Sequence, residues 1–349
     1  MHSFYSIGSA TLSKLLVVLV LTFCSVVEAV KYESLDVWVD HLYWMPFYFT
    51  NVTLGSQKQN VTVLVDTGSY YLYVEDVQNT ECNSICKKLG TFDSEHSTTF
   101  HNLSVPFNEF SAKGFYGADD FLYPDGKKIS QYQFAVTRNQ GTYGNILGLA
   151  SRLEDARNIY WATKQIGAAD TQGYSFYAGD YTKGIVGKYI IGALDRAKYE
   201  GELQVFDHEE LKFPFTTFTL ADGQVFQMNN TLMLFDTGAR AIGVAKEIAD
   251  PINKALGADE KGHFPCSWRN LDKSVEFNLG GLNFSVPYSD FFHTNPDGSC
   301  SSAFQIGVGN LMGSDISRHL YFAANQETKK VAIAKIKVTD ETDMIPFNF

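Results

Sequence analysis

An Asp-Thr-Gly triplet occurs twice in this chain, each time directly after a run of apolar residues. The first closes the stretch VTVLVDTG at residues 61–68, and the second closes LMLFDTG at residues 232–238. One such triplet is usually a turn, because Asp bonds its own backbone and Gly accepts a positive φ. Two copies at the ends of buried strands place two carboxylates in the core, where an unpaired charge is costly. We therefore expect Asp66 and Asp236 to have one common role.

The remaining pattern favours a mostly β protein made of two related halves. Short runs rich in Val, Thr, Phe and Tyr alternate with Gly, Asn and Asp, which is typical of strands joined by turns. Helices are expected only over residues 150–167 and 245–257, with Pro251 interrupting or restarting the second. An apolar pair ending in Gly follows each triplet, in NILGLA (145–150) and NLMGSD (310–315). A duplicated unit with a two-fold axis would bring the two triplets together.

Charge and motif content argue against several classes of function. A formal net charge of −11 over 349 residues leaves no basic footprint for nucleic acid. The eight His show no HExxH spacing, and no GxGxxG occurs in a βαβ setting, so we expect neither a metal nor a cofactor. The chain also has no GxSxG, which argues against a serine hydrolase.

The N-terminus has the features of a secretory signal. Lys14 precedes the apolar run LLVVLVLTF, and Val27 and Ala29 occupy the −3 and −1 places of a small-residue cleavage site, so residues 1–29 are predicted to be a signal peptide. A signal anchor is the alternative. The run is too short for a comfortable membrane span, and we expect no stable membrane insertion. The chain should be secreted or reside in a lysosomal or other endomembrane lumen.

Cysteines and glycosylation sequons agree with export. Beyond Cys24 in the signal, four cysteines remain, an even set that allows three disulfide pairings. We expect Cys82–Cys86 and Cys266–Cys300, in which each pair lies within one half of the chain; a zinc site is the rival interpretation. Five Asn-x-Ser/Thr sequons are candidate glycan sites: Asn51, Asn60, Asn102, Asn229 and Asn283.

A pair of buried carboxylates can perform acid–base chemistry. Two Asp side chains about 3 Å apart cannot both ionise, so they share one proton. The ionised member can take a proton from a water held between them, and the protonated member can donate to a carbonyl oxygen. Thr67 and Thr237 can tie the two loops together, and Gly68 and Gly238 let the backbone approach the carboxylates closely.

On these residues the chain resembles the pepsin-type aspartic proteases, over nearly all of its length after the signal. Besides the first DTGS (66–69), the segments FDSEHSTTF (92–100), NILGLA, GALDRAKYEGEL (192–203) and NLMGSDISRHLYFAANQETKKVAIAK (310–335) are similar to family motifs in the same order. The resemblance implies a mostly β, bilobal fold, with two six-stranded-type lobes related by a pseudo-two-fold axis and a substrate cleft between them. It also implies that Ser69 bonds Asp66, and that the partners are extended polypeptide substrates. We expect a monomer.

Under this resemblance the chain divides into a signal peptide and three further parts. Residues 30–43 form a short N-terminal segment, a candidate vestigial pro-segment, followed by an N-terminal lobe over 44–200 and a C-terminal lobe over 201–349. The segment 30–43 carries three acidic residues against a single Lys31, so it is a poor candidate for neutralising a carboxylate pair.

Two departures from the family pattern touch the site. Phe107 stands at the place of the family's flap Tyr, in PFNEFSAKGF (106–115), and Tyr73 replaces the usual Trp partner. Ala239 follows the second triplet where most members have Ser or Thr, and loss of that hydroxyl should raise the lower apparent pKa of the carboxylate pair.

The expected function is an aspartic endopeptidase with an acidic to mildly acidic optimum. The alternative is a catalytically weak or inactive relative that binds peptides or proteins.

Overall fold

Residues 29–42, 45–109, 112–139, 144–150, 154–181, 183–307 and 309–349 are described by a computed structural model of the chain. The predicted signal peptide, with Cys24, therefore lies outside the described residues except for Ala29. Lys31–Phe349 forms one compact unit.

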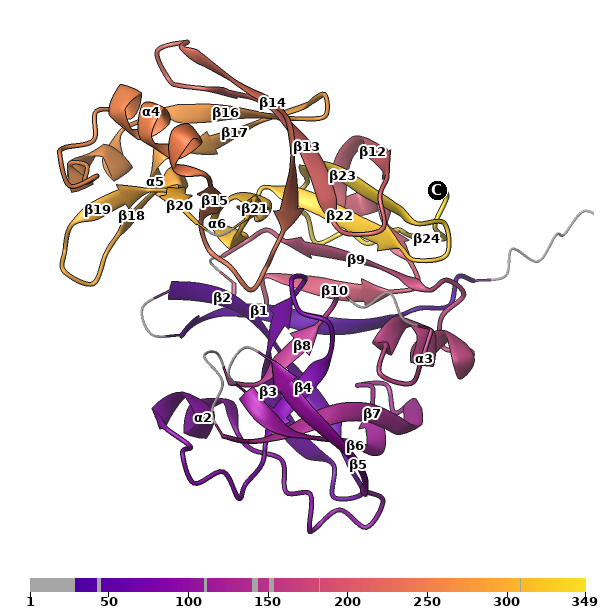
Figure 1. Cartoon of the computed structure of the whole chain (residues 1–349). Helices are drawn as coiled ribbons and strands as arrows, with labels where there is room; N and C mark the ends of the chain where they lie inside the picture. The colour runs from indigo at the N-terminus through magenta and orange to yellow at the C-terminus, as the bar shows by residue number, and fades with distance from the viewer. Residues whose placement is uncertain are drawn as a thin grey trace, which may run out of the picture. The chain divides into compact units, whose positions relative to one another are not determined.

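Two sheets hold most of this unit, which is mostly β as the sequence predicts (Figure 1). The larger sheet has thirteen described strands. From one edge to the other they are β12 (Tyr199–Asp207), β23 (Lys330–Ile336), β22 (Leu320–Asn325), β9 (Gly173–Ala178), β10 (Gly187–Ile191), β1 (Glu33–Leu42), β2 (Met45–Leu54), β3 (Gln59–Asp66), β8 (Ile146–Gly148), β4 (Leu72–Glu75), β7 (Lys128–Asn139), β6 (Ala112–Leu122) and β5 (His101–Glu109).

The smaller sheet and the helices lie mainly in the second half of the chain. The sheet has seven described strands in the order β17 (Leu282–Pro287), β16 (Ser274–Leu279), β13 (Lys212–Thr219), β14 (Val225–Phe235), β21 (Leu311–Met312), β15 (Ile242–Val244) and β20 (Phe304–Ile306). Two short pairs join β11 (Leu194–Asp195) to β24 (Met344–Ile345) and β18 (Phe292–Thr294) to β19 (Cys300–Ser302). The described helices are α2 (Ser84–Leu89), α3 (Ile159–Gln165), η1 (Arg196–Lys198), α4 (Lys246–Leu256), η2 (Cys266–Asn270), α5 (Tyr288–Phe291) and α6 (Ser314–Ser317).

The same strand motif occurs once in each sheet, at the two Asp-Thr-Gly loops. In the larger sheet β3 pairs in parallel with β8, which places Asp66 opposite Gly148, and β4 runs antiparallel to β8. In the smaller sheet β14 pairs in parallel with β21, which places Phe235 opposite Met312, and β15 runs antiparallel to β21. These matching pairings agree with the predicted duplication. Each triplet thus leaves the end of a strand that is paired inside its sheet.

The short segment before the first predicted lobe is part of the larger sheet. β1 pairs with β10 over residues 33–37 and with β2 over residues 38–42, and Leu35 in it is buried. The predicted boundary between residues 200 and 201 falls inside β12, which pairs with β23 from near the C-terminus. The larger sheet therefore contains strands from both halves of the chain. A division into lobes at these residue numbers stays a prediction.

Both predicted helical regions contain a helix, but with changed ends. α3 begins at Ile159 and not near residue 150, because the side chain of Asn158 caps it by accepting hydrogen bonds from the amides of its first turn. α4 runs through Pro251, so the predicted interruption is wrong. One apolar face of α4 is buried, and this packing outweighs the hydrogen bond that proline cannot donate.

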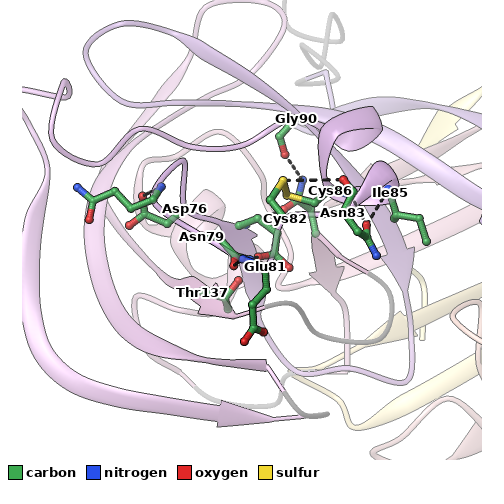
Figure 2. Close-up of a disulfide and its surroundings, with 12 residues drawn as sticks. Asp76, Asn79, Glu81, Cys82, Asn83, Ile85, Cys86, Gly90 and Thr137 are labelled. Carbon is green, nitrogen blue, oxygen red and sulfur yellow. Dashed lines mark hydrogen bonds between the residues drawn. A yellow bond between two sulfur atoms is a disulfide. The ribbon is translucent and has the colours of Figure 1, made fainter.

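Both predicted disulfides are present. Cys82–Cys86 joins the residues around the start of α2, with Cα atoms 5.3 Å apart. Beside it, Asn83 caps the same helix by accepting from the amide of Ile85 at 2.8 Å (Figure 2). Cys266–Cys300 connects η2 to β19 across a sequence separation of 34 residues.

The surface of the unit carries all five predicted glycan sites. Their Asn side chains are exposed: Asn51, Asn60, Asn102, Asn229 and Asn283. Among the helices of the described ranges, none has the length and apolar character needed to cross a membrane.

The two disulfides should contribute unequally to stability, because they close loops of different length. Loop-closure entropy assigns about 4 kcal/mol to the separation of 34 residues and about 2 kcal/mol to the separation of 4 residues. Replacing Cys266 and Cys300 by Ala should therefore lower the free energy of unfolding in guanidinium chloride more than replacing Cys82 and Cys86. Equal losses, or a larger loss at the short loop, would contradict this expectation.

Candidate active site

The two Asp-Thr-Gly loops lie against each other, and each threonine reaches across to the other strand. Thr67 Oγ1 donates to the carbonyl of Phe235 at 2.6 Å, and Thr237 Oγ1 donates to the carbonyl of Val65 at 2.6 Å. The backbone amides of Thr67 and Thr237 each donate to the other threonine's Oγ1 at 3.0 Å. Both threonines are buried. Each hydroxyl is therefore both a donor and an acceptor, and the four bonds fix the separation of the loops.

Each glycine of the triplets packs against the opposite carboxyl group. A Cβ atom on Gly68 would lie 2.7 Å from Cγ of Asp236, and a Cβ atom on Gly238 would lie 2.4 Å from Cγ of Asp66. Both distances are far below van der Waals contact, and a carboxyl that is hydrogen-bonded in the loop has no room to retreat. Close approach, and not an unusual backbone angle, is what requires glycine at both positions.

The two carboxyl groups differ by one hydroxyl donor. Asp66 Oδ1 accepts from the amides of Gly68 and Ser69 at 2.7 and 3.2 Å, and Asp66 Oδ2 accepts from Ser69 Oγ at 2.5 Å. Asp236 accepts from the amide of Gly238 at 2.9 Å and from the amide of Ala239. Ala239 has no hydroxyl at the place that matches Ser69, so the second carboxyl lacks the corresponding bond.

The carboxyl of Asp236 holds its proton more tightly than an ordinary aspartate. Burial raises the pKa of Asp236 well above its usual value, and the neighbouring charge of Asp66 and a hydrogen bond with Asp66 act in the same direction. The amides of Gly238 and Ala239 oppose this rise without cancelling it. The pair is thus suited to hold one proton and one negative charge between two carboxyl groups.

The residues predicted for the flap lie where the hairpin of β5 and β6 meets β4. Phe107 is the buried residue of β5, and its ring centroid lies 5.3 Å from that of Tyr73 on β4. On its other side Phe107 meets Tyr116 of β6 edge to face at 5.5 Å. The expected contact of Phe107 with Tyr73 is therefore present as ring packing. Residues 110 and 111 of the predicted flap segment lie outside the described residues.

The segment after the second triplet is held by α6. Three successive amides of residues 313–315 donate to carbonyls of residues 239–241 at 2.9–3.1 Å. The side chains of Arg240 and Asp315 form an ion pair at 2.9 Å, with only 11% and 10% of them exposed. Burial raises the pKa of Asp315 to about 6, although the charge of Arg240 acts against the rise. Sequence reasoning missed this pair because its members are 75 residues apart.

A second arginine lies beside the first triplet. The guanidinium of Arg157 is 5.0 Å from the ring centroid of Tyr71, which follows Ser69 by two residues. Asp155 fixes its direction, with Nη2 of Arg157 2.6 Å from Oδ2 of Asp155. No sequence motif signals Arg157.

The chemistry that the site offers is acid–base chemistry. Two carboxyl groups in hydrogen-bond contact, one of them with a raised pKa, can accept and donate a proton at neighbouring positions. In the described ranges of the chain, no group of three or more His, Cys, Asp or Glu side chains is placed to hold a metal ion.

Comparisons with known proteins identify the family. A family model described as Eukaryotic aspartyl protease matches residues 47–336. The chain is 28% identical to aspartic proteinase yapsin-3 of Saccharomyces cerevisiae, over 83% of this chain and 66% of that protein, so it spans about two thirds of that relative's length. It is 27% identical to candidapepsin-1 and to secreted aspartic protease 1 of Candida albicans, over 85% of this chain and 83% of each relative.

The family match covers the elements that build the site. It starts within β2, includes both Asp-Thr-Gly loops and ends with β23, and the mostly β architecture agrees with the bilobal fold expected for this family. Because the matched residues make up most of the chain, this protein belongs to the eukaryotic aspartyl protease family, and so to the aspartic-type endopeptidases.

Proposed function

We propose that the chain hydrolyses peptide bonds with a water molecule activated by Asp66 and Asp236. The observation that carries this proposal is the reciprocal bonding of Thr67 and Thr237, which brings the two carboxyls into hydrogen-bond contact. Two buried carboxyl groups in contact cost stability, because ionisation of one disfavours ionisation of the other, and a purely structural turn would not require them. Acid–base catalysis does require such a pair, because one group must accept a proton while the other donates one.

The proposed reaction follows from a pair that carries a single proton. The ionised carboxylate takes a proton from the water while the water oxygen attacks the peptide carbonyl carbon, and the protonated carboxyl donates to the carbonyl oxygen. The tetrahedral species then collapses as the C–N bond breaks: one of its hydroxyl groups returns a proton to the carboxylate that is now ionised, and the leaving nitrogen takes the proton from the other carboxyl, so the pair again holds one proton. The remaining residues of the two triplets support this geometry, and Ser69 orients the Asp66 carboxyl through its 2.5 Å bond.

Extended polypeptides, with apolar side chains next to the cut bond, are the proposed substrates. Tyr70, 42% exposed, offers an aromatic surface one residue beyond Ser69. A small cavity lined in part by Gly68, Tyr70 and Leu149 lies beside the first triplet. Phe107 and Tyr73 belong to the flap region that is proposed to cover the substrate.

A catalytically weak relative that binds peptides is the second candidate. Two observations favour it. Phe107 packs against Tyr73 but carries no hydroxyl, and Ala239 leaves Asp236 without a side-chain donor. The pair of carboxyls itself is complete, which is why the peptidase is the first proposal.

Export through the secretory route is proposed for the chain, with residues 1–29 as the signal peptide. The two disulfides and the five exposed sequons fit an oxidising, glycosylating compartment. The name of one relative, secreted aspartic protease 1, fits the same location. A secreted or cell-surface monomer is the first expectation, and a lysosomal or other lumenal location is the alternative.

Removing either carboxyl should abolish peptide cleavage. Asp66→Asn and Asp236→Asn each leave a neutral group of the same shape, so we expect kcat to fall by about 10³-fold or more for a group that must exchange a proton in the transition state. Peptide cleavage is measured by mass spectrometry between pH 3 and pH 7. Asp259→Asn, at an exposed turn, is the control and should cleave as the wild type does. A folded Asp66→Asn variant with wild-type turnover would overturn the proposal.

The carboxyl of Asp236 should lower the stability of the fold at neutral pH. The folded-state pKa of Asp236 lies above its unfolded value, so its contribution to stability is fully present below about pH 4 and is lost as pH rises through the folded pKa. Asp236→Asn cannot ionise, and its melting temperature should exceed that of the wild type at pH 7 and match it near pH 3. Calorimetry at both pH values tests this. A variant less stable than wild type at pH 7 would contradict the raised pKa.

Restoring a hydroxyl at position 239 should shift the pH dependence. In Ala239→Ser the new hydroxyl can donate to Asp236 as Ser69 donates to Asp66, which lowers the pKa of Asp236. We expect the alkaline limb of the pH profile of kcat/KM to move to lower pH. Ala241→Ser, two residues further on, is the matched control. A limb that stays in place or moves to higher pH would show that the missing hydroxyl does not tune the pair.

A further inference from the structure

We propose that Arg157 is a positioning residue that holds the flap hairpin, β5 and β6, beside the first Asp-Thr-Gly loop by stacking on Tyr71 and Tyr116. The inference rests on the proposed peptidase function, in which this hairpin covers the substrate. It assigns a role to a side chain that takes no part in the acid–base chemistry.

The outer strand of the hairpin, β5, has one buried side chain along its length. β5 is the last strand of the larger sheet and pairs with β6 alone among the described strands. Of its residues His101–Glu109, Phe107 is the buried one. The pairing of β5 with β6 also shifts register between Asn102 and Val105. A strand at a sheet edge with one buried side chain depends on its partner strand for its position, so the contacts of β6 decide where the hairpin lies.

A chain of aromatic rings leads from the hairpin to the first triplet. Phe107 of β5 meets Tyr116 of β6 edge to face, with ring centroids 5.5 Å apart. Tyr116 then meets Tyr71 edge to face at 6.0 Å. Tyr71 follows Ser69, the donor to Asp66, by two residues. Edge-to-face pairs are favourable but weak when they are alone. The ladder of β6 with β7 fixes the backbone at Tyr116, opposite Ala135, but not the ring, so a further contact on the ring would favour one arrangement.

Arg157 supplies that contact. Its guanidinium lies 5.0 Å from the ring centroid of Tyr71 and 5.5 Å from that of Tyr116, so one cation bridges the loop and the hairpin. Asp155 holds the guanidinium at two points, with Nη2 and Nε of Arg157 2.6 and 3.1 Å from Oδ2. Burial also raises the pKa of Tyr116 to about 12, so its phenol stays neutral beside the half-buried carboxylate of Glu109.

The chain contains a matched contact on the opposite side of the same strand. Arg138 lies 5.1 Å from the ring of Phe115, the neighbour of Tyr116 in β6, and its Nε is 3.0 Å from Oδ2 of Asp76. Successive residues of a strand point to opposite faces. Arg138 thus makes the same kind of bridge to β6 as Arg157 does, but away from Tyr71.

The test compares Arg157→Met with Arg138→Met in the full chain. We expect Arg157→Met to lower kcat/KM for a peptide substrate about tenfold, mainly through a higher KM, because the hairpin is no longer held beside the first triplet. Arg157→Lys keeps the cation and should recover part of the loss. Arg138→Met should keep kcat/KM within about twofold of the wild type.

Amide hydrogen exchange of the free protein supplies a readout that needs no turnover. Exchange at residues 112–116 should speed up in Arg157→Met and in Asp155→Asn, which loosens the guanidinium, and not in Arg138→Met. If the wild type lacks peptidase activity, this comparison still decides the positioning role. Unchanged exchange in a folded Arg157→Met variant, or equal effects of the two Arg→Met changes on exchange or on KM, would overturn the proposal.

Discussion

Two threonine hydroxyls, each crossing to the opposite strand, hold the loops that carry two buried carboxyl groups against each other. These bonds oppose the separation of Asp66 and Asp236 that the desolvation of both groups, and their repulsion when both are ionised, would favour. The bonds to the carbonyls of Val65 and Phe235 anchor each hydroxyl to the end of a sheet strand. The unfavourable charge pair is therefore supported by backbone that the sheets already hold rigid.

The surrounding structure repeats this arrangement with local differences. β8 backs the first loop and β21 backs the second in the same parallel pairing, so the two triplets receive equivalent support. The first loop gains the hydroxyl of Ser69, while the segment after the second is held by the amides of residues 313–315. The two carboxyls therefore sit in similar frames but have different donors. In this account, that difference decides which of them keeps the shared proton.

Much of this site can be predicted from the sequence, because the motifs that identify it are short and local. A triplet after an apolar run identifies Asp66 and Asp236, and the duplication alone indicates that they meet. The sequence predicts that the glycine of each triplet lets the backbone approach a carboxylate closely. The structure adds that each glycine packs against the carboxyl of the opposite triplet. Arg240 and Asp315 could not be paired from the sequence, since only the folding of β21 and α6 brings position 315 beside the second triplet. Tertiary packing also overrode the local rule at Pro251, where the buried face of α4 keeps the helix continuous.

The central claim is that the two carboxyls share one proton, and carbon-13 NMR of the aspartate carboxyl groups tests it directly. Spectra of protein labelled at Asp, recorded against pH, can be assigned with the Asp66→Asn and Asp236→Asn variants. The account predicts that the pair titrates in two separate steps, the upper one, assigned mainly to Asp236, well above the ordinary Asp range near pH 4. If both carboxyls ionise together within the ordinary range, the carboxyls do not share a proton and the account is wrong.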